Sequence, residues 1–313
     1  MMDKFERSWQ LFKTSLDVIW RDKKLLLFPI LTTLFTIILV ALFLMPVAFE
    51  RTGYSYTSAQ HWQAVGRSLY VTDGTQNWGA THSGRFSIRG VRPLAAGYFA
   101  VLYFATMFCA TFFNVAFYQQ ILNALAGQAV SIMDGLRFAI SKWKAILLWT
   151  LFAGAVGYII KMLEQRFGWI GQWIMKLIGA AWSVACVFVI PVIITEQETS
   201  NPLVMLKKSA LTLKQTWGES LIGYAGLGFG NAIIAVLSLV WLGGTVAVSM
   251  ALHFYWMIAV AVVLWLAALI FWSYVMNVAS QIFRCALFLY ASQGTMPHPY
   301  TQEMAAIAWR KKS

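Results

Sequence analysis

The chain has 313 residues, of which 59% are hydrophobic and only 12% are charged. A soluble domain carries about twice that charged fraction, so the composition excludes an ordinary soluble globular protein. The formal charge of +12 lies beside apolar segments, which favours anionic lipid headgroups over nucleic acid as the partner of the basic residues.

The first part of the chain predicts a surface helix and two membrane spans. Residues 3–21 have apolar side chains at helical spacing with charged ones opposite, as in a helix lying in the headgroup plane. The uncharged run 25–49 is long enough to cross a hydrocarbon core of ~30 Å. Residues 50–93 read as a polar extracytoplasmic loop that rests its aromatic side chains on the membrane interface, with a binding lid as the alternative. A second span is predicted at 95–118.

A second amphipathic helix is predicted at 131–144, where Ser131 and Asp134 form a capping-box-like start. Two further apolar runs follow it. They predict a third span at 145–162 and a fourth at 171–195.

The last part of the chain repeats this order. A third amphipathic helix is predicted at 202–217, with Asn201 as its N-cap. The apolar run that follows is about three bilayers long at ~1.5 Å per residue, so it must fold back. The pair Gly243-Gly244 is the expected break, which gives spans at 220–241 and 253–278.

Each amphipathic helix, called an elbow below, precedes a pair of spans. The sequence therefore predicts an all-α polytopic membrane protein with six transmembrane helices in a single membrane domain, 1–313. Its three elbow-plus-hairpin repeats are 1–128, 129–199 and 200–313. Most of the 24 Lys and Arg residues fall on the side of the elbows. This bias predicts a bacterial inner-membrane protein with both termini cytoplasmic.

The sequence offers little that could be catalytic. The four histidines have no metal-ligand spacing with each other or with a cysteine, and no glycine-rich phosphate loop is present. We therefore expect no enzyme activity, no cofactor and no metal.

Three residues around the third elbow are candidates for moving a cation or proton. Pro191 interrupts backbone bonding late in the fourth span, as in the broken helices of transporters. Glu196 and Glu219 place carboxylates at the two span ends nearest this break. The alternative is that these carboxylates only anchor the span ends, paired with Lys207, Lys208 or Lys214. Proton coupling would require the lysines to point away into water.

Polar residues inside the spans form a second candidate group. Asn231 and Arg284 belong to it, together with Asn114, Asn277 and Gln281. Such side chains commonly form hydrogen bonds across helices. The alternative is that they line a wet cavity that faces the inner side.

Several short stretches resemble an uncharacterised family of prokaryotic six-span membrane proteins. They are Ala181-Trp182-Ser183, Phe188 to Val192, Glu196, Lys208-Ser209-Ala210 and Thr216 to Ser220, with Arg7-Ser8-Trp9 and Lys24 to Pro29 at the start. The elbow-and-span repeats are also loosely similar to the membrane domain of glycerophosphodiester phosphodiesterases, whose catalytic barrel has no counterpart here. The resemblance implies a fold but no activity, cofactor or catalytic residue.

Three functions follow as hypotheses. A transport or permeation element for a small solute or ion predicts that polar span residues converge on one cavity. A membrane scaffold or assembly factor that acts through helix packing and partner proteins predicts a dry, closely packed bundle with exposed partner surfaces. A homo-oligomer is a further possible partner state. A lipid enzyme predicts clustered acidic or histidine side chains at one depth.

Overall fold

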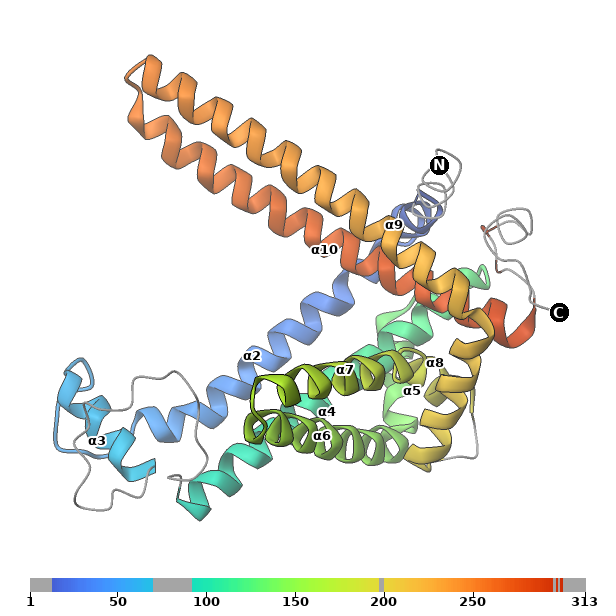
Figure 1. Cartoon of the computed structure of the whole chain (residues 1–313), viewed down its shortest axis with the longest axis horizontal. Helices are drawn as coiled ribbons and strands as arrows, with labels where there is room; N and C mark the ends of the chain where they lie inside the picture. The colour runs from blue at the N-terminus through green and yellow to red at the C-terminus, as the bar shows by residue number, and fades with distance from the viewer. Residues whose placement is uncertain (1–12, 70–91, 197–199, 295–296, 298, 301–313) are drawn as a thin grey trace.

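The computed structural model describes residues 13–69, 92–196, 200–294, 297, 299 and 300, with the backbone alone for residues 170 and 215–237. Every regular element within these ranges is a helix (Figure 1). Residues 13–21 are helical. The elements after them are η1 (Lys23–Leu26), α2 (Leu27–Ala48), α3 (Ala59–Leu69), α4 (Pro93–Leu125), α5 (Ile132–Ser141), α6 (Trp143–Arg166), α7 (Trp169–Ala185), α8 (Val189–Thr195), α9 (Pro202–Ala251) and α10 (Tyr255–Gln293).

Five helical segments of the described chain are long and apolar enough to cross a membrane, which indicates a multi-pass membrane protein. They are Lys23–Ala48, Pro93–Leu125, Trp143–Arg166, Gly171–Thr195 and Tyr255–Gln293. They correspond to the first four predicted spans and the sixth. The predicted fifth span lies within α9, where the side chains of 215–237 are outside the described residues. The count of six spans and the division into three repeats therefore stay predictions.

The structure corrects two expectations about the end of the chain. The third elbow and the fifth span are not separate, because α9 is one helix of 50 residues. The predicted break at Gly243-Gly244 is also wrong: both glycines are inside α9, and the chain turns at Leu252–Phe254, where His253 has φ 58°. A glycine costs a helix only about 1 kcal/mol. In an apolar environment, opening the helix would cost more, because the freed N–H and C=O groups find no water.

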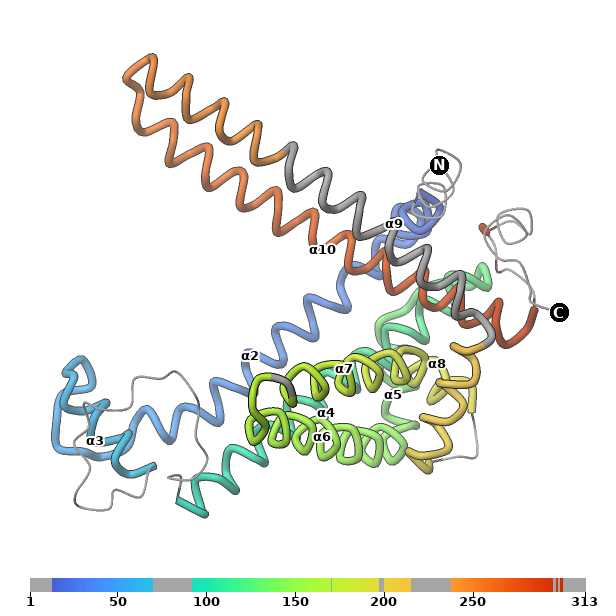
Figure 2. The backbone as a smooth tube through the Cα atoms, viewed as in Figure 1, coloured from blue at the N-terminus to red at the C-terminus, as the bar shows by residue number. Residues whose placement is uncertain are grey.

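The helices pack mainly as antiparallel neighbours. Helix α4 contacts α2, α5, α6, α8 and α10, so it is the centre of the bundle. Helix α6 packs on α7, and the stacked rings of Trp149 and Trp182 lie 6.4 Å apart between them. The hairpin of α9 and α10 projects from the rest of the molecule and turns back at its tip (Figure 2).

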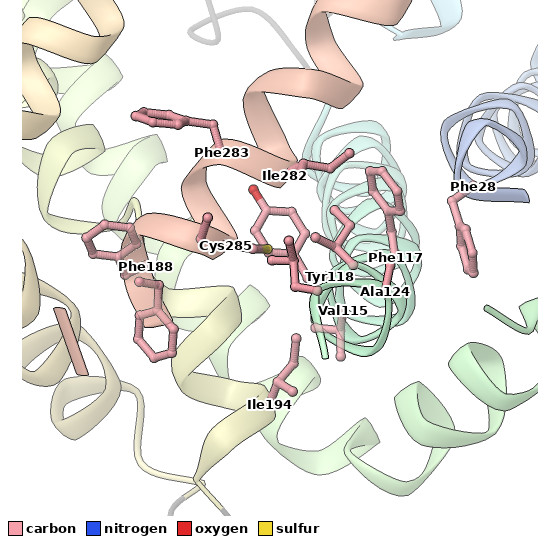
Figure 3. Packing of buried hydrophobic residues seen from close by; sticks show 14 of the residues in the cluster. Phe28, Val115, Phe117, Tyr118, Ala124, Phe188, Ile194, Ile282, Phe283 and Cys285 are labelled. Carbon is pink, nitrogen blue, oxygen red and sulfur yellow. The ribbon is translucent and has the colours of Figure 1, made fainter. Parts of the chain in front are cut away.

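The buried core sits where α4, α8 and α10 meet near the start of α2 (Figure 3). Phe28 and Phe117 stack with their ring centroids 5.5 Å apart, and Phe188 lies 5.8 Å from Phe288. Cys285 is fully buried in the same cluster and forms no disulfide. The core therefore joins one end of α2, α4 and α10, while the hairpin tip and the far end of α2 extend beyond it.

The N-caps of the second and third elbows are as predicted, but the return bond of the capping box is not: the N–H of Ser131 donates to the side chain of Gln120 and not to Asp134. The side chain of Ser131 accepts a hydrogen bond of 3.3 Å from the backbone N–H of Asp134, and Asn201 accepts one of 3.0 Å from Leu203.

Helix α5 turns small residues toward the protein: Gly135 and Ala139 are buried, Leu136 is partly buried, and Met133 and Ile140 are exposed. Small residues permit this close approach of helix backbones.

The first half of the 50–93 loop contains α3, which the sequence did not predict. His61 of α3 is fully buried. Its Nε2 donates to the backbone oxygen of Ala48 at 2.9 Å, since a carbonyl can only accept, and its Nδ1 lies 2.6 Å from the hydroxyl of Thr52. These bonds fasten the loop to the end of α2. Residues 70–91 lie outside the described chain, so the choice between interface loop and binding lid stays open.

Candidate functional site

A cavity of about 600 Å³ lies between α2, α4 and α10. Ten residues line it: Pro29, Thr32, Thr33, Asn114, Leu269, Ile270, Ser273, Tyr274, Asn277 and Gln281. Three of them, Asn114, Asn277 and Gln281, are the polar span residues that the sequence offered as either helix-bonding or cavity-lining. The structure brings these three together at one cavity.

Helical spacing explains the polar wall contributed by α10. Ser273, Asn277 and Gln281 are four residues apart, so they lie above one another on the same face of the helix. The opposite wall comes from the first two turns of α2, and α4 adds the amide of Asn114. The remaining α10 residues of the lining, Leu269 and Ile270, are apolar.

The hydrogen bonds of the lining leave groups available to a ligand. The amide nitrogen of Gln281 donates to Oδ1 of Asn277 at 2.5 Å, and Oε1 of Gln281 is buried without a hydrogen-bond partner among the described residues. Thr32 and Thr33 donate to the carbonyls of Phe28 and Pro29 one turn earlier, at 2.9 and 2.8 Å. Their oxygens can still accept. The wall is therefore suited to hydrogen-bonding an uncharged polar group.

Tyr274 fixes one edge of the cavity. Its hydroxyl donates to the backbone oxygen of Leu26 at the end of η1, which ties α10 to the start of α2. This carbonyl is in the turn just before α2. The bond therefore sets the position of α10 relative to the threonines of α2 that form the opposite wall.

Pro191 follows a real interruption of the fourth span, but away from the cavity. Helix α7 ends at Ala185 and α8 begins at Val189, with Pro191 buried as the third residue of α8. The fully buried hydroxyl of Ser209, on α9, bridges the gap: it donates to the oxygen of Ala185 at 2.6 Å and accepts from the N–H of Phe188 at 3.1 Å. A single protein side chain thus bonds both helix ends.

Glu196 is engaged at the end of α8. Its carboxylate pairs with Nζ of Lys208 at 2.6 Å, and its backbone oxygen accepts from Nζ of Lys142 at 2.6 Å. Partial burial lowers the pKa of Lys142, which the nearby charge of Glu196 opposes. Lys208 does not point away from Glu196, as proton coupling would require. The geometry is that of the alternative interpretation, a span-end carboxylate paired with an elbow lysine.

The other predicted residues are not brought to the cavity by any described contact. Glu219 and Asn231 lie on α9, where their side chains are outside the described residues. Arg284 is half-buried on α10, three residues after Gln281, and does not belong to the lining. The candidate groups around Pro191 and around the span amides therefore belong to different parts of the fold.

Several residues that the structure places at the cavity or at the helix break were not identified from the sequence. Thr32, Thr33, Ser273 and Tyr274 line the cavity, and Ser209 holds the helix break. The four-residue spacing of Ser273, Asn277 and Gln281 was the available signal. Nothing in the sequence indicated that α2 would supply the facing wall.

Replacing Glu196 with glutamine is expected to shift the melting temperature of the detergent-solubilised protein by no more than about 3 °C, since exposed ion pairs contribute about 1 kcal/mol or less. Both partners are partly exposed, with 43% of the Lys208 side chain and 34% of the Glu196 side chain accessible. The matched control is Glu164→Gln, which removes the Lys161 pair of 3.0 Å on α6. A markedly larger loss for Glu196→Gln than for the control would show that the pair is structurally essential.

Comparison with known proteins supports the part of the first resemblance that concerns an uncharacterised family. No curated protein and no solved structure matches the chain. A family profile described as a family of unknown function (DUF6159) matches residues 95–297, from the start of α4 to just beyond α10. The match includes Asn114 and the α10 wall of the cavity but not α2. The likeness to the membrane domain of glycerophosphodiester phosphodiesterases stays a sequence resemblance. Because the match spans well over half of the 313 residues, the chain belongs to this family of unknown function, DUF6159.

Proposed function

We propose that the protein is a non-enzymatic transport or permeation element of the membrane, with the cavity between α2, α4 and α10 as its binding site for a small polar, uncharged ligand. One observation carries the proposal: amides from two spans, Asn114 on α4 and both Asn277 and Gln281 on α10, converge on one cavity of about 600 Å³. Convergence of polar span residues is what a transport element requires.

The composition of the lining favours this function over the two alternatives. A scaffold that acts through helix packing has no need for polar groups around an open space in its membrane domain. A lipid enzyme needs an acid, a base or a nucleophile at the site. The lining contains hydroxyls, Ser273 among them, but none of its ten residues is acidic, basic, a histidine or a cysteine that could activate a hydroxyl.

Contacts between the elbows support the proposed topology. Arg21, at the end of the first elbow, donates to the oxygen of Ala124 just before the second, and Lys24 donates to the oxygen of Val130 at 3.4 Å. At the other end of the second elbow, Lys142 reaches Glu196, which pairs with the third elbow. These bonds link residues at the elbows to neighbouring span ends and support an arrangement with the three elbows at one end of the bundle. We propose that this end faces the cytoplasm at the bacterial inner membrane and contacts anionic headgroups.

The proposal predicts a cavity-dependent solute flux. Proteoliposomes containing the protein are expected to swell faster than empty liposomes in an osmotic gradient of at least one solute from a panel of small polyols, amides and sugars. The double variant Asn277→Leu with Gln281→Leu removes the amide pair, and its excess rate is expected to fall roughly tenfold, as for the loss of two hydrogen bonds.

A similar amide pair on α4 provides the control. Gln119 donates to Oδ1 of Asn123 at 3.3 Å, and neither residue lines the cavity. The double variant Gln119→Leu with Asn123→Leu should keep the wild-type rate. Swelling equal to that of empty liposomes for every solute would overturn the proposal. So would an excess rate that the cavity variant leaves unchanged.

A further inference from the structure

We infer that the ligand of the cavity is an amphiphile with an uncharged, hydroxyl-bearing head, which enters sideways from the bilayer between α2 and α10. This inference rests on the proposed function because it uses the same polar wall, and it adds a class of ligand that solute swelling does not report. Adducts at the cavity without any swelling would support the amphiphile and overturn the flux of small solutes. The inference follows from three features of the cavity: where it opens, how polarity changes along it, and which nearby charges are already engaged.

The cavity opens on the flank of the bundle. Three of its polar residues, Thr33, Ser273 and Asn277, are exposed although they belong to helices that can span a membrane. The apolar side chains beside them face outward as well, with Ile270 of the lining 70% exposed and Ile30 of α2 52% exposed. Exposed apolar side chains on spanning helices contact lipid tails. A ligand can therefore reach the polar wall from within the bilayer.

Polarity changes in one direction along α10. Leu269 and Ile270 come first, Ser273 follows one turn later, and Asn277 and Gln281 come last. The distance from Leu269 to Gln281 along the helix is ~18 Å at ~1.5 Å per residue. An amphiphile has the same gradient, with its chain beside the leucine and isoleucine and its head at the two amides. A uniformly polar solute would leave the apolar end of this wall unmatched.

The amides and hydroxyls that would contact the head of the ligand favour an uncharged head. Amides and hydroxyls both donate and accept, as an alcohol head requires. Two cations near the start of α2 are directed elsewhere: Arg21 donates to the oxygen of Ala124 and Lys24 to that of Val130. These bonds hold positive charge at the carboxyl end of α4, where the helix dipole favours it. Lys23 is exposed and does not belong to the lining. A phosphate at the amides would enter the cavity without a lining cation to neutralise it.

Photocrosslinking in nanodiscs tests the inference. The wild-type protein is incubated with a diacylglycerol that carries a diazirine in one acyl chain, irradiated, digested and sequenced by mass spectrometry. Adducts are expected on the peptides that contain Leu269 and Ile270 in α10 and Thr33 in α2. The yield should fall roughly tenfold in Asn277→Leu with Gln281→Leu, as expected when two hydrogen bonds to the head are lost, but not in Gln119→Leu with Asn123→Leu.

Competition experiments distinguish a lipid head from a free polyol, and a neutral head from a charged one. Together with the flux assay, they also distinguish failure of this inference from failure of the proposed function. Unlabelled diacylglycerol is expected to suppress the adducts, whereas free glycerol and phosphatidic acid at the same concentration are not. Suppression by free glycerol would contradict the claim that the ligand is an amphiphile. Stronger suppression by phosphatidic acid than by diacylglycerol would contradict the claim that its head is neutral. If no adduct forms at the cavity while solute flux remains sensitive to the amide pair, the inference fails and the proposed function stands. If neither the adduct yield nor the solute flux changes in the variant Asn277→Leu with Gln281→Leu, both the inference and the proposed function fail.

Discussion

Replacing Ser209 with alanine is expected to lower the free energy of unfolding by about 2–4 kcal/mol, because a buried N–H and a partly buried C=O would both lose the hydroxyl that bonds them. The hydroxyl donates to Ala185 at the end of α7 and accepts from Phe188 before α8, at 2.6 and 3.1 Å. Helix ends carry unbonded backbone groups that something must satisfy. Ser209 does so here within the apolar core, where water is scarce.

The size of this effect can be measured by unfolding the protein in mixed detergent micelles with increasing SDS. Ser183→Ala is the matched control, because that hydroxyl, also at the fourth span, donates only to the carbonyl of Gly179 one turn earlier and is exposed. Its replacement should change stability by less than about 0.5 kcal/mol. If Ser209→Ala were as mild as the control, the bridge would not hold the helix break.

Replacing Gly135 with valine is expected to destabilise the bundle by about 3 kcal/mol or more, the cost of overpacking a close contact. A Cβ at this position would lie 3.0 Å from the backbone oxygen of Ala116, 3.0 Å from the side chain of Gln120 and 3.2 Å from that of Phe28. The carbonyl belongs to the central helix α4 and cannot turn aside. The side-chain oxygen of Gln120 also accepts from the N–H of Ser131 at 2.8 Å, so displacing it would loosen the start of α5.

Gly243→Val is the matched control for this prediction. Gly243 is also inside a helix, yet a Cβ there would meet nothing within 4 Å. Its substitution should be neutral or slightly stabilising, because glycine in a helix interior is unfavourable by about 1 kcal/mol relative to alanine. Thermal unfolding of the two variants in the same detergent compares them. Equal melting temperatures would contradict the tight packing of α5 on α4.

Some features of this protein follow from local chemistry and were therefore predictable. Apolar runs long enough for a bilayer indicated the spans up to Thr195, since hydropathy and length need no knowledge of neighbours. Ser131 and Asn201 cap their helices through bonds to residues two or three positions away. The pairing of Glu196 with an elbow lysine was among the alternatives, because both lie where a span meets an elbow.

The turn between α9 and α10 depends on more than local sequence. Glycine propensity suggested Gly243-Gly244, but the chain turns ten residues later, at His253. The two helices pack along their length, and a break inside α9 would sacrifice that packing together with backbone hydrogen bonds that an apolar environment cannot replace. The position of the turn is therefore set by the pairing of two helices.

The sequence by itself determined the helical membrane architecture, the starts of two elbows and the group of amides from which the site is drawn. Only the tertiary structure decided that Asn114, Asn277 and Gln281 share a cavity, with Thr32 and Thr33 opposite, while Arg284 remains outside the lining. The physical reason is distance along the chain. Hydropathy and helical spacing describe one helix at a time, whereas the cavity depends on how α2, α4 and α10 pack together, and side chains far apart in sequence set that packing.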